Sequence, residues 1–189
     1  VGSVHAHGEF AKDFTATLMM QSPSGYKPVF LKTIFGVDDH AGSRVEFPEC
    51  TAYQIMNPLK IDCSYKQENA LISTNYGDAF LINRPWYEDY IVNSLQNECA
   101  LRVSFPMTLI CQDTFKNISV PGLEKLAFSV TSPWVNAKRE LAVAGNDLII
   151  TETLERLTSI IPAHDLKSKA FEELKETFRK YKSGAIVFS

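Results

Sequence analysis

The sequence of 189 residues lacks the motifs that bind nucleotides or support the common hydrolytic reactions. Neither Gly-x-Gly-x-x-Gly nor Gly-x-x-x-x-Gly-Lys-Ser/Thr occurs, which excludes the usual phosphate-binding loops. Gly-x-Ser-x-Gly and His-Glu-x-x-His are also absent, which excludes the nucleophile elbow of hydrolases and the helix of zinc proteases. We therefore expect a protein that is not an enzyme and that uses no cofactor and no metal.

Cysteine is scarce and widely spaced, at Cys50, Cys63, Cys99 and Cys111. No Cys-x-x-Cys occurs, so neither a zinc ribbon nor a thioredoxin-type redox pair is expected. Cys63 and Cys111 stand in alternating apolar stretches, which favours a role as small buried hydrophobic residues. Two disulfides are an alternative, and together with the Asn117-Ile118-Ser119 sequon they would indicate a secreted domain.

Long apolar runs and a strong charge are lacking too. No stretch approaches the ~18 apolar residues that a transmembrane helix needs. The net charge of −3 does not favour bulk nucleic-acid binding, which requires a dense basic surface. Residues 1–100 carry 7 Lys/Arg and 12 Asp/Glu, and residues 101–189 carry 12 and 10. The basic C-terminal half would fit an anionic membrane or an acidic partner, and the alternative is the ordinary asymmetry of a globular domain.

The beginning of the chain predicts a tail and a hairpin. Residues 1–8 read as a flexible lead-in, in which His5 and His7 would share one side of an extended chain, a spacing that can also bind a metal. Alternating apolar residues predict strands over 14–21 and 29–37, joined by a turn at 22–25. The polar residues 38–43 are expected to form a solvated loop, and the alternative is that Asp38 and Asp39 beside His40 bind a cation or act as acid and base.

The middle of the chain is rich in strand patterns. Alternation and turn residues predict strands in the ranges 45–47, 52–55, 59–65, 70–75, 78–82, 100–112 and 126–131. Pro106 favours an edge position or a bulge in the strand that contains it. Residues 136–143 fit either a short helix or a strand, and residues 148–157 mix both periods.

The C-terminal quarter predicts an amphipathic helix over 165–182 and then a strand. Asp165 is a good N-cap, and apolar residues follow at three- and four-residue steps: Leu166, Ala170, Leu174, Phe178 and Tyr181. Gly184 suits the end of the helix, and Ala185–Phe188 reads as a buried strand. The predicted fold class is α+β: a mainly antiparallel sheet or sandwich in one domain, residues 9–189, closed by this helix and a last short strand.

Two groups of residues form the candidate interaction surface. Arg84, Trp86, Tyr87 and Tyr90 gather arginine and aromatic side chains in one loop, a composition that is typical of binding sites, although the same residues could cap the core. The second group is basic and lies at the end of the predicted helix: Arg179, Lys180 and Lys182.

The segments Asp165–Ala170 and Tyr181–Val187 resemble the C-terminal helix and strand of rhabdovirus matrix proteins of the vesiculovirus type. The Lys-rich tail and the Pro-Pro-x-Tyr motif of that family do not occur here. The resemblance implies a structural protein of the virion or the infected cell that self-associates under a membrane and condenses a nucleocapsid. Its expected partners are further copies of itself, a protein or nucleocapsid, and an anionic membrane surface. Two alternatives remain open: a secreted or ectodomain β-sandwich recognition module, and a small-ligand carrier.

Overall fold

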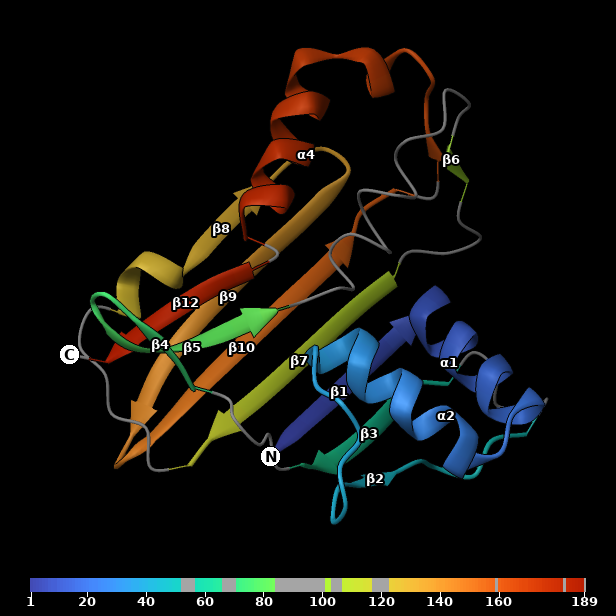
Figure 1. Cartoon of the computed structure of the whole chain (residues 1–189). Coiled ribbons are helices and arrows are strands. Elements are labelled where there is room, and N and C mark those ends of the chain that lie inside the picture. Colours follow the sequence, from blue (N-terminus) through green and yellow to red (C-terminus); the bar gives the residue numbers. More distant parts are fainter. Residues whose placement is uncertain are drawn as a thin grey trace.

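The computed structural model describes residues 1–51, 57–65, 71–83, 101–102, 107–116, 123–158, 160–181 and 183–188. Its architecture confirms an α+β fold that is mostly antiparallel sheet, with a C-terminal helix and a last strand (Figure 1). The strands are β1 (Gly2–Gly8), β2 (Arg44–Glu46), β3 (Leu59–Ser64), β4 (Leu71–Thr74), β5 (Gly77–Asn83), β6 (Leu101–Arg102), β7 (Met107–Phe115), β8 (Phe128–Thr131), β9 (Val135–Ala144), β10 (Asp147–Arg156), β11 (Ile160–Ile161) and β12 (Ser183–Phe188). The α-helices are α1 (Glu9–Met20), α2 (Pro23–Phe30) and α4 (Lys169–Tyr181).

The main sheet has seven strands in the order β2-β3-β1-β7-β10-β9-β8, and every neighbouring pair is antiparallel. The prediction of a flexible lead-in at residues 1–8 was wrong, because these residues contain β1, which pairs with β3 on one side and β7 on the other. Val4 and Ala6 are fully buried, whereas His5 and His7 lie on the opposite face of the strand. Alternation over so few residues gave too weak a signal beside the two polar histidines.

The predicted hairpin over 14–21 and 29–37 was also wrong, because both stretches are helical. α1 buries Phe10, Ala11 and Phe14, a spacing of a helix rather than a strand. α2 begins at the predicted turn, where Ser22 accepts a hydrogen bond from the amide of Gly25 and Pro23 occupies the first helical position. A π-helical turn, Leu31–Phe35, follows directly and ends at Gly36 in the left-handed region.

A second, smaller sheet has the order β12-β5-β4 and packs on the main sheet. The predicted strands around 70–75 and 78–82 are confirmed as β4 and β5, joined by a tight turn at Asn75–Tyr76. Phe80 and Ile82 of β5 meet Leu148 and Ile150 of β10 in one cluster. The last strand is therefore built into the fold by pairing with β5 along its whole length.

α4 confirms the C-terminal helix but shifts its start and its buried face. Asp165 lies in a short 3-10 turn, Asp165–Lys167. Ser168 takes the capping role expected of Asp165, because its hydroxyl accepts a hydrogen bond from the amide of Phe171 at 3.2 Å. Phe171, Leu174 and Phe178 are buried, whereas Ala170 is exposed. The two strand-or-helix ambiguities at 136–143 and 148–157 resolve as strands, namely the long hairpin of β9 and β10.

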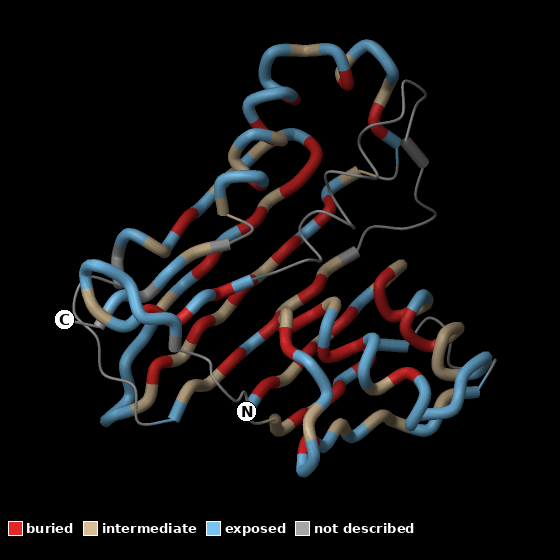
Figure 2. The backbone as a smooth tube through the Cα atoms, viewed as in Figure 1, coloured by how far each residue is buried: buried red, intermediate tan, exposed pale blue. Residues whose placement is uncertain are grey.

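The two faces of the main sheet differ in chemistry. Within the described ranges, α1, α2, α4 and the small sheet all pack on one face, which carries the buried alternate residues of each strand (Figures 1 and 2). The other face carries polar side chains, among them His5, Thr153 and Lys138. No helix of the described residues is both long and apolar enough to cross a membrane.

Candidate interaction surfaces

Most of the candidate surface expected from the sequence lies outside the described residues. Arg84, Trp86, Tyr87, Tyr90 and Lys182 lie outside the described residues, as do the strand predicted at 52–55, Cys99, Pro106 and Asn117. Only Arg179 and Lys180 can be located, and both are exposed on the last turn of α4. The joining of the loop and the helix into one surface therefore stays a prediction.

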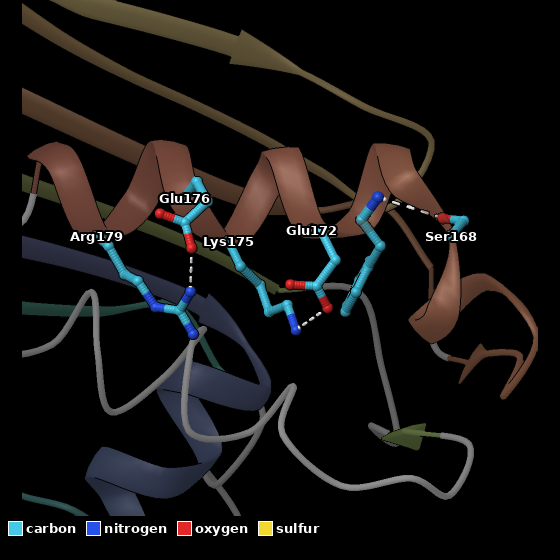
Figure 3. Close-up of polar contacts among 6 residues, drawn as sticks. Ser168, Glu172, Lys175, Glu176 and Arg179 are labelled. Carbon is cyan, nitrogen blue, oxygen red and sulfur yellow. Dashed lines mark hydrogen bonds and ion pairs between the residues drawn. The ribbon is translucent and has the colours of Figure 1, made fainter.

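The exposed side of α4 carries paired charges rather than an open basic patch. Lys175 pairs with Glu172, and Arg179 pairs with Glu176, each one helical turn apart (Figure 3). Lys169 lies 3.5 Å from Glu173. Three of the four basic residues between Lys169 and Tyr181 thus have an acidic neighbour on the same helix, while the Nζ of Lys180 lies 5.0 Å from the ring centroid of Tyr181. Such neutralised faces give little electrostatic attraction to an anionic surface.

Polar groups hold α4 on the sheet at both of its ends. At the start, the indole of Trp134 donates to Asp165 at 3.2 Å and stands edge-on to Phe171 with 5.0 Å between ring centroids. At the end, the ring of Tyr181 stacks on Phe128 of β8 at 4.6 Å. The guanidinium of Arg139 donates to the carbonyl of Tyr181 at 2.8 Å. These contacts hold the helix and the 3-10 turn before it against β8 and β9.

The outer face of the small sheet is apolar and open. Leu81 of β5 is 49% exposed, Ile72 of β4 is 47% exposed and Val187 of β12 is 39% exposed. Ile72 and Val187 lie opposite Ala79 in the register, so all of these side chains point away from the main sheet. We call Ile72, Leu81, Ala185 and Val187 the outer apolar face; Ala79, which lies between Ile72 and Val187 in the register, is only 2% exposed. Tyr76, in the turn between β4 and β5, is also strongly exposed.

Two shallow hollows lie near the other end of the main sheet. A groove of about 320 Å³ runs between the edge strand β8 and α4, with Val130, Pro133, Leu174 and Thr177 among its lining residues. A hollow of about 260 Å³ on the polar face has a lining that includes Lys138, Thr153 and Glu155. Both hollows are open to solvent, and the polar side chains that line them are typical of a protein surface.

The chain matches no protein-family model, no curated protein and no solved structure. Its function must therefore be inferred from these surfaces and from the buried polar groups.

The other candidate sites from the sequence are resolved by simple contacts. Asp38 accepts a hydrogen bond from Lys32 at 2.7 Å, which lowers the pKa of its carboxyl, and Asp39 lies 3.0 Å from Lys27. In the described ranges no three His, Cys, Asp or Glu side chains gather where they would hold a metal ion. Cys50, Cys63 and Cys111 are free thiols, so the alternative of two disulfides is contradicted.

Sequence reasoning missed the outer apolar face, although a signal was present. Ala79-Phe80-Leu81-Ile82 is apolar at four consecutive positions, which places apolar side chains on both faces of β5. The main sheet covers the side that carries Phe80 and Ile82. The apolar character of the other side, which carries Leu81, therefore pointed to an exposed apolar surface.

Proposed function

We propose that this chain is a non-enzymatic assembly protein that associates with further copies of itself through the outer apolar face. The observation that carries the proposal is the exposure of Leu81, Ile72 and Val187 on three adjacent strands. Isolated exposed apolar residues are common on protein surfaces, but a contiguous group on one sheet is typical of an interface.

The composition of this surface favours a second apolar sheet as the occupant. Among the described side chains that point outward from the small sheet, none is charged: Ile72, Thr74, Ala79, Leu81, Asn83, Ala185 and Val187. Two sheets pack well face to face when alternate apolar residues interdigitate. A second copy supplies an identical surface, and a two-fold axis lets each copy contribute the same residues.

Three strands offer only a small contact area, so the association is expected to be weak. Interfaces well below ~1,200 Å² are usually transient, and we expect a dissociation constant on the order of 10–100 µM, or about 6 kcal/mol. Assembly proteins commonly combine many such weak contacts, since avidity multiplies their effect. The resemblance of residues 165–187 to matrix proteins agrees with this class of function and stays a prediction.

Sedimentation velocity over a concentration series from about 1 µM to 1 mM tests the proposal. The substitution Leu81→Asp places a charge at the centre of the outer apolar face and is expected to leave only monomer, because a carboxylate would be desolvated in the interface. Val143→Asp is the matched control, because Val143 of β9 is also 49% exposed on a strand but lies outside the face. It should associate as the wild type does.

A wild-type protein that stays monomeric up to 1 mM would contradict the proposal. Association that survives Leu81→Asp but is lost in Val143→Asp would move the interface to the tip of the β9–β10 hairpin. Thermal unfolding of both variants is needed beside the sedimentation data, so that loss of association is not confused with loss of folding.

A further inference from the structure

Arg156 is a buried cation at the end of β10. Its side chain is 4% exposed and lies on the covered face of the main sheet. Its neighbours across the sheet are Met107 of β7 and Val135 of β9, and Leu154, two residues earlier on the same face, is 1% exposed. A charged group is therefore held in surroundings that are otherwise largely apolar.

Two nitrogens of the Arg156 guanidinium have no partner among the described residues. Its Nε and Nη2 atoms are buried and have no hydrogen-bond partner, and no ion pair to Arg156 occurs within the described ranges. Burial lowers the pKa of this guanidinium, but arginine remains protonated at any pH at which the protein is folded. Buried charges without a partner are costly and are seldom kept without a function.

Arg139 demonstrates how the same fold accommodates a buried arginine when its role is structural. Its Nε donates to Glu152 at 2.8 Å, its Nη2 donates to the carbonyl of Tyr181, and its guanidinium lies 5.4 Å from the ring centroid of Phe128. Arg139 and Glu152 are both essentially inaccessible to solvent. Arg156 lies only a few residues away on the neighbouring strand. The lack of hydrogen-bond partners for two of its nitrogens in the described part of the chain is therefore specific to its position and is not shared by every buried arginine of this core.

No carboxylate among the described residues forms an ion pair with Arg156, although three have buried atoms. Glu9 pairs with Lys12 through Oε1, and its Oε2 is buried without a hydrogen-bond partner. The other two are Glu152 and Asp113. Glu152 pairs with Arg139, and Asp113 accepts a hydrogen bond from Tyr65 at 2.6 Å. Asp113 also lies opposite Ile150, six residues from Arg156 along β10, which is about 20 Å in an extended strand.

A second buried donor lies two residues farther along the chain. The hydroxyl of Thr158 is also buried and has no hydrogen-bond partner among the described residues. The amide of Leu157 donates to the carbonyl of Trp134 at 2.9 Å, which continues the β-ladder past Arg156. Alternate residues of an extended chain project to the same side, so Arg156 and Thr158 direct their polar groups into one region.

We propose that Arg156 and Thr158 form a binding site for the oxyanion group, carboxylate or phosphate, of a small molecule. The planar guanidinium offers two parallel N–H donors that match two oxygens of such a group, and the hydroxyl of Thr158 supplies a third donor. Because Arg156 is almost completely enclosed, the occupant is a small molecule rather than a surface such as a membrane or a nucleic acid. The site is independent of self-association through the outer apolar face.

Thermal unfolding in three salts tests the site, with sodium phosphate, sodium acetate and sodium chloride compared at equal ionic strength and pH. Phosphate or acetate at ten times its dissociation constant is expected to raise the Tm of the wild type by about 3–6 °C over chloride. Arg156→Met should lose this increase, and in chloride it should be at least as stable as the wild type, because an apolar side chain replaces an unpaired charge. Arg44→Met is the matched control, because Arg44 is an exposed arginine on the edge strand β2.

The response to the two probes also identifies the chemistry. A larger effect of phosphate points to a phosphate ester as the ligand, and a larger effect of acetate points to a carboxylate. The Nε–H resonance of Arg156 in ¹⁵N-labelled wild-type protein gives a readout that does not depend on any variant, and it should shift on titration with the effective anion.

Three outcomes would overturn the site: a wild-type Tm that is the same in all three salts with no shift of the Arg156 resonance, an anion effect retained in Arg156→Met, or an equal loss in Arg44→Met. If Arg156→Met does not fold, Thr158→Val and the wild-type resonance decide the matter by the same criteria. A monomeric protein that still binds phosphate would contradict self-association and leave this site intact.

Discussion

Arg139 and Glu152 form an ion pair in the layer between the main sheet and the elements that cover it, with both side chains excluded from water. The pair links β9 to β10, and the second nitrogen of Arg139 reaches the last residue of α4. A buried pair contributes little over an apolar one, but removing one partner leaves the other charge without compensation. These two residues therefore matter more for the specificity of the packing than for its total stability.

We expect Glu152→Gln to lower the free energy of unfolding by about 3–5 kcal/mol, because it leaves Arg139 charged and buried. Urea denaturation measures this change. Glu140→Gln is the control, because Glu140 pairs with Lys138 at 2.9 Å on the same strand as Arg139 but in solvent, and should cost less than ~1 kcal/mol. The double variant Arg139→Met with Glu152→Met should regain most of the loss. A cost below ~1 kcal/mol for Glu152→Gln would contradict this view of the pair.

Cys63 predicts a specific dependence of stability on pH. Burial, with a smaller contribution from the negative charge of Asp113, raises the pKa of its thiol to about 12 from the usual 9.0. The unfolded thiol therefore ionises above pH 9 while the folded thiol stays protonated. Stability is fully present below pH 9 and is lost as the pH rises toward 12, by up to about 1.4 kcal/mol per pH unit.

Urea denaturation of the wild type and of Cys63→Ala at pH 8, 9, 10 and 11 measures this loss. The difference in unfolding free energy between the two proteins should shrink steadily above pH 9. Cys50→Ala is the control, because Cys50 is only partly buried. A difference between wild type and Cys63→Ala that is constant over this range would show that the thiol is not shielded from solvent.

At the scale of elements, β1 is an unexpected interior strand of the main sheet. It joins the β2-β3 pair to the β7-β10-β9-β8 group, so removing it would leave two unpaired edges and the undersides of α1 and α2 exposed. A glycine at position 2 allows β1 to pack under the ring of Phe35, since a Cβ atom there would lie 2.7 Å from that ring. Helix α1 follows β1 without a loop and turns back over the strand that precedes it.

Hydrogen exchange tests the position of β1. The amides of β1 that bond to its two neighbours should be among the slowest in the protein, because their exchange requires the sheet to open. The edge strand β2, paired on one side only, provides an internal comparison and should exchange faster. Rapid exchange throughout residues 2–8 would instead favour the flexible lead-in that the sequence suggested.

At the scale of the whole molecule, the covering elements and the apolar surfaces are distributed unequally. The described helices and the small sheet all cover one face of the main sheet, and the small sheet then presents an apolar face of its own. The salt dependence of sedimentation distinguishes association through the outer apolar face from association through a basic surface. Association through the outer apolar face should persist at 0.5 M NaCl, whereas association through a basic surface would weaken, because the Debye length falls below ~5 Å.

Much of the architecture followed from local patterns. Strands β3, β4, β5 and β8 lie where alternation predicts them, and the helix near the C-terminus follows from the spacing of Leu174 and Phe178. The single strand predicted over 100–112 corresponds to two strands of different sheets, β6 and β7. The prediction of strands within residues 9–35 was wrong for a physical reason. Phe14, Ala16, Leu18 and Met20 alternate as in a strand, but Phe10, Ala11 and Phe14 also fit the helix period, and the capping residues Ser22 and Pro23 carried the deciding information.

The sequence by itself determined the class of the fold, the small buried thiols and the amphipathic C-terminal helix, because each depends on residues that are neighbours along the chain. Only the tertiary structure decided that residues 2–8 lie inside the sheet, that Glu152 is paired with Arg139, and that Arg156 has no ion-pair partner in the described part of the chain. Those properties depend on which strands become neighbours across the sheet. A pattern of period two fixes the face on which a side chain lies, but not the charge that it will meet there.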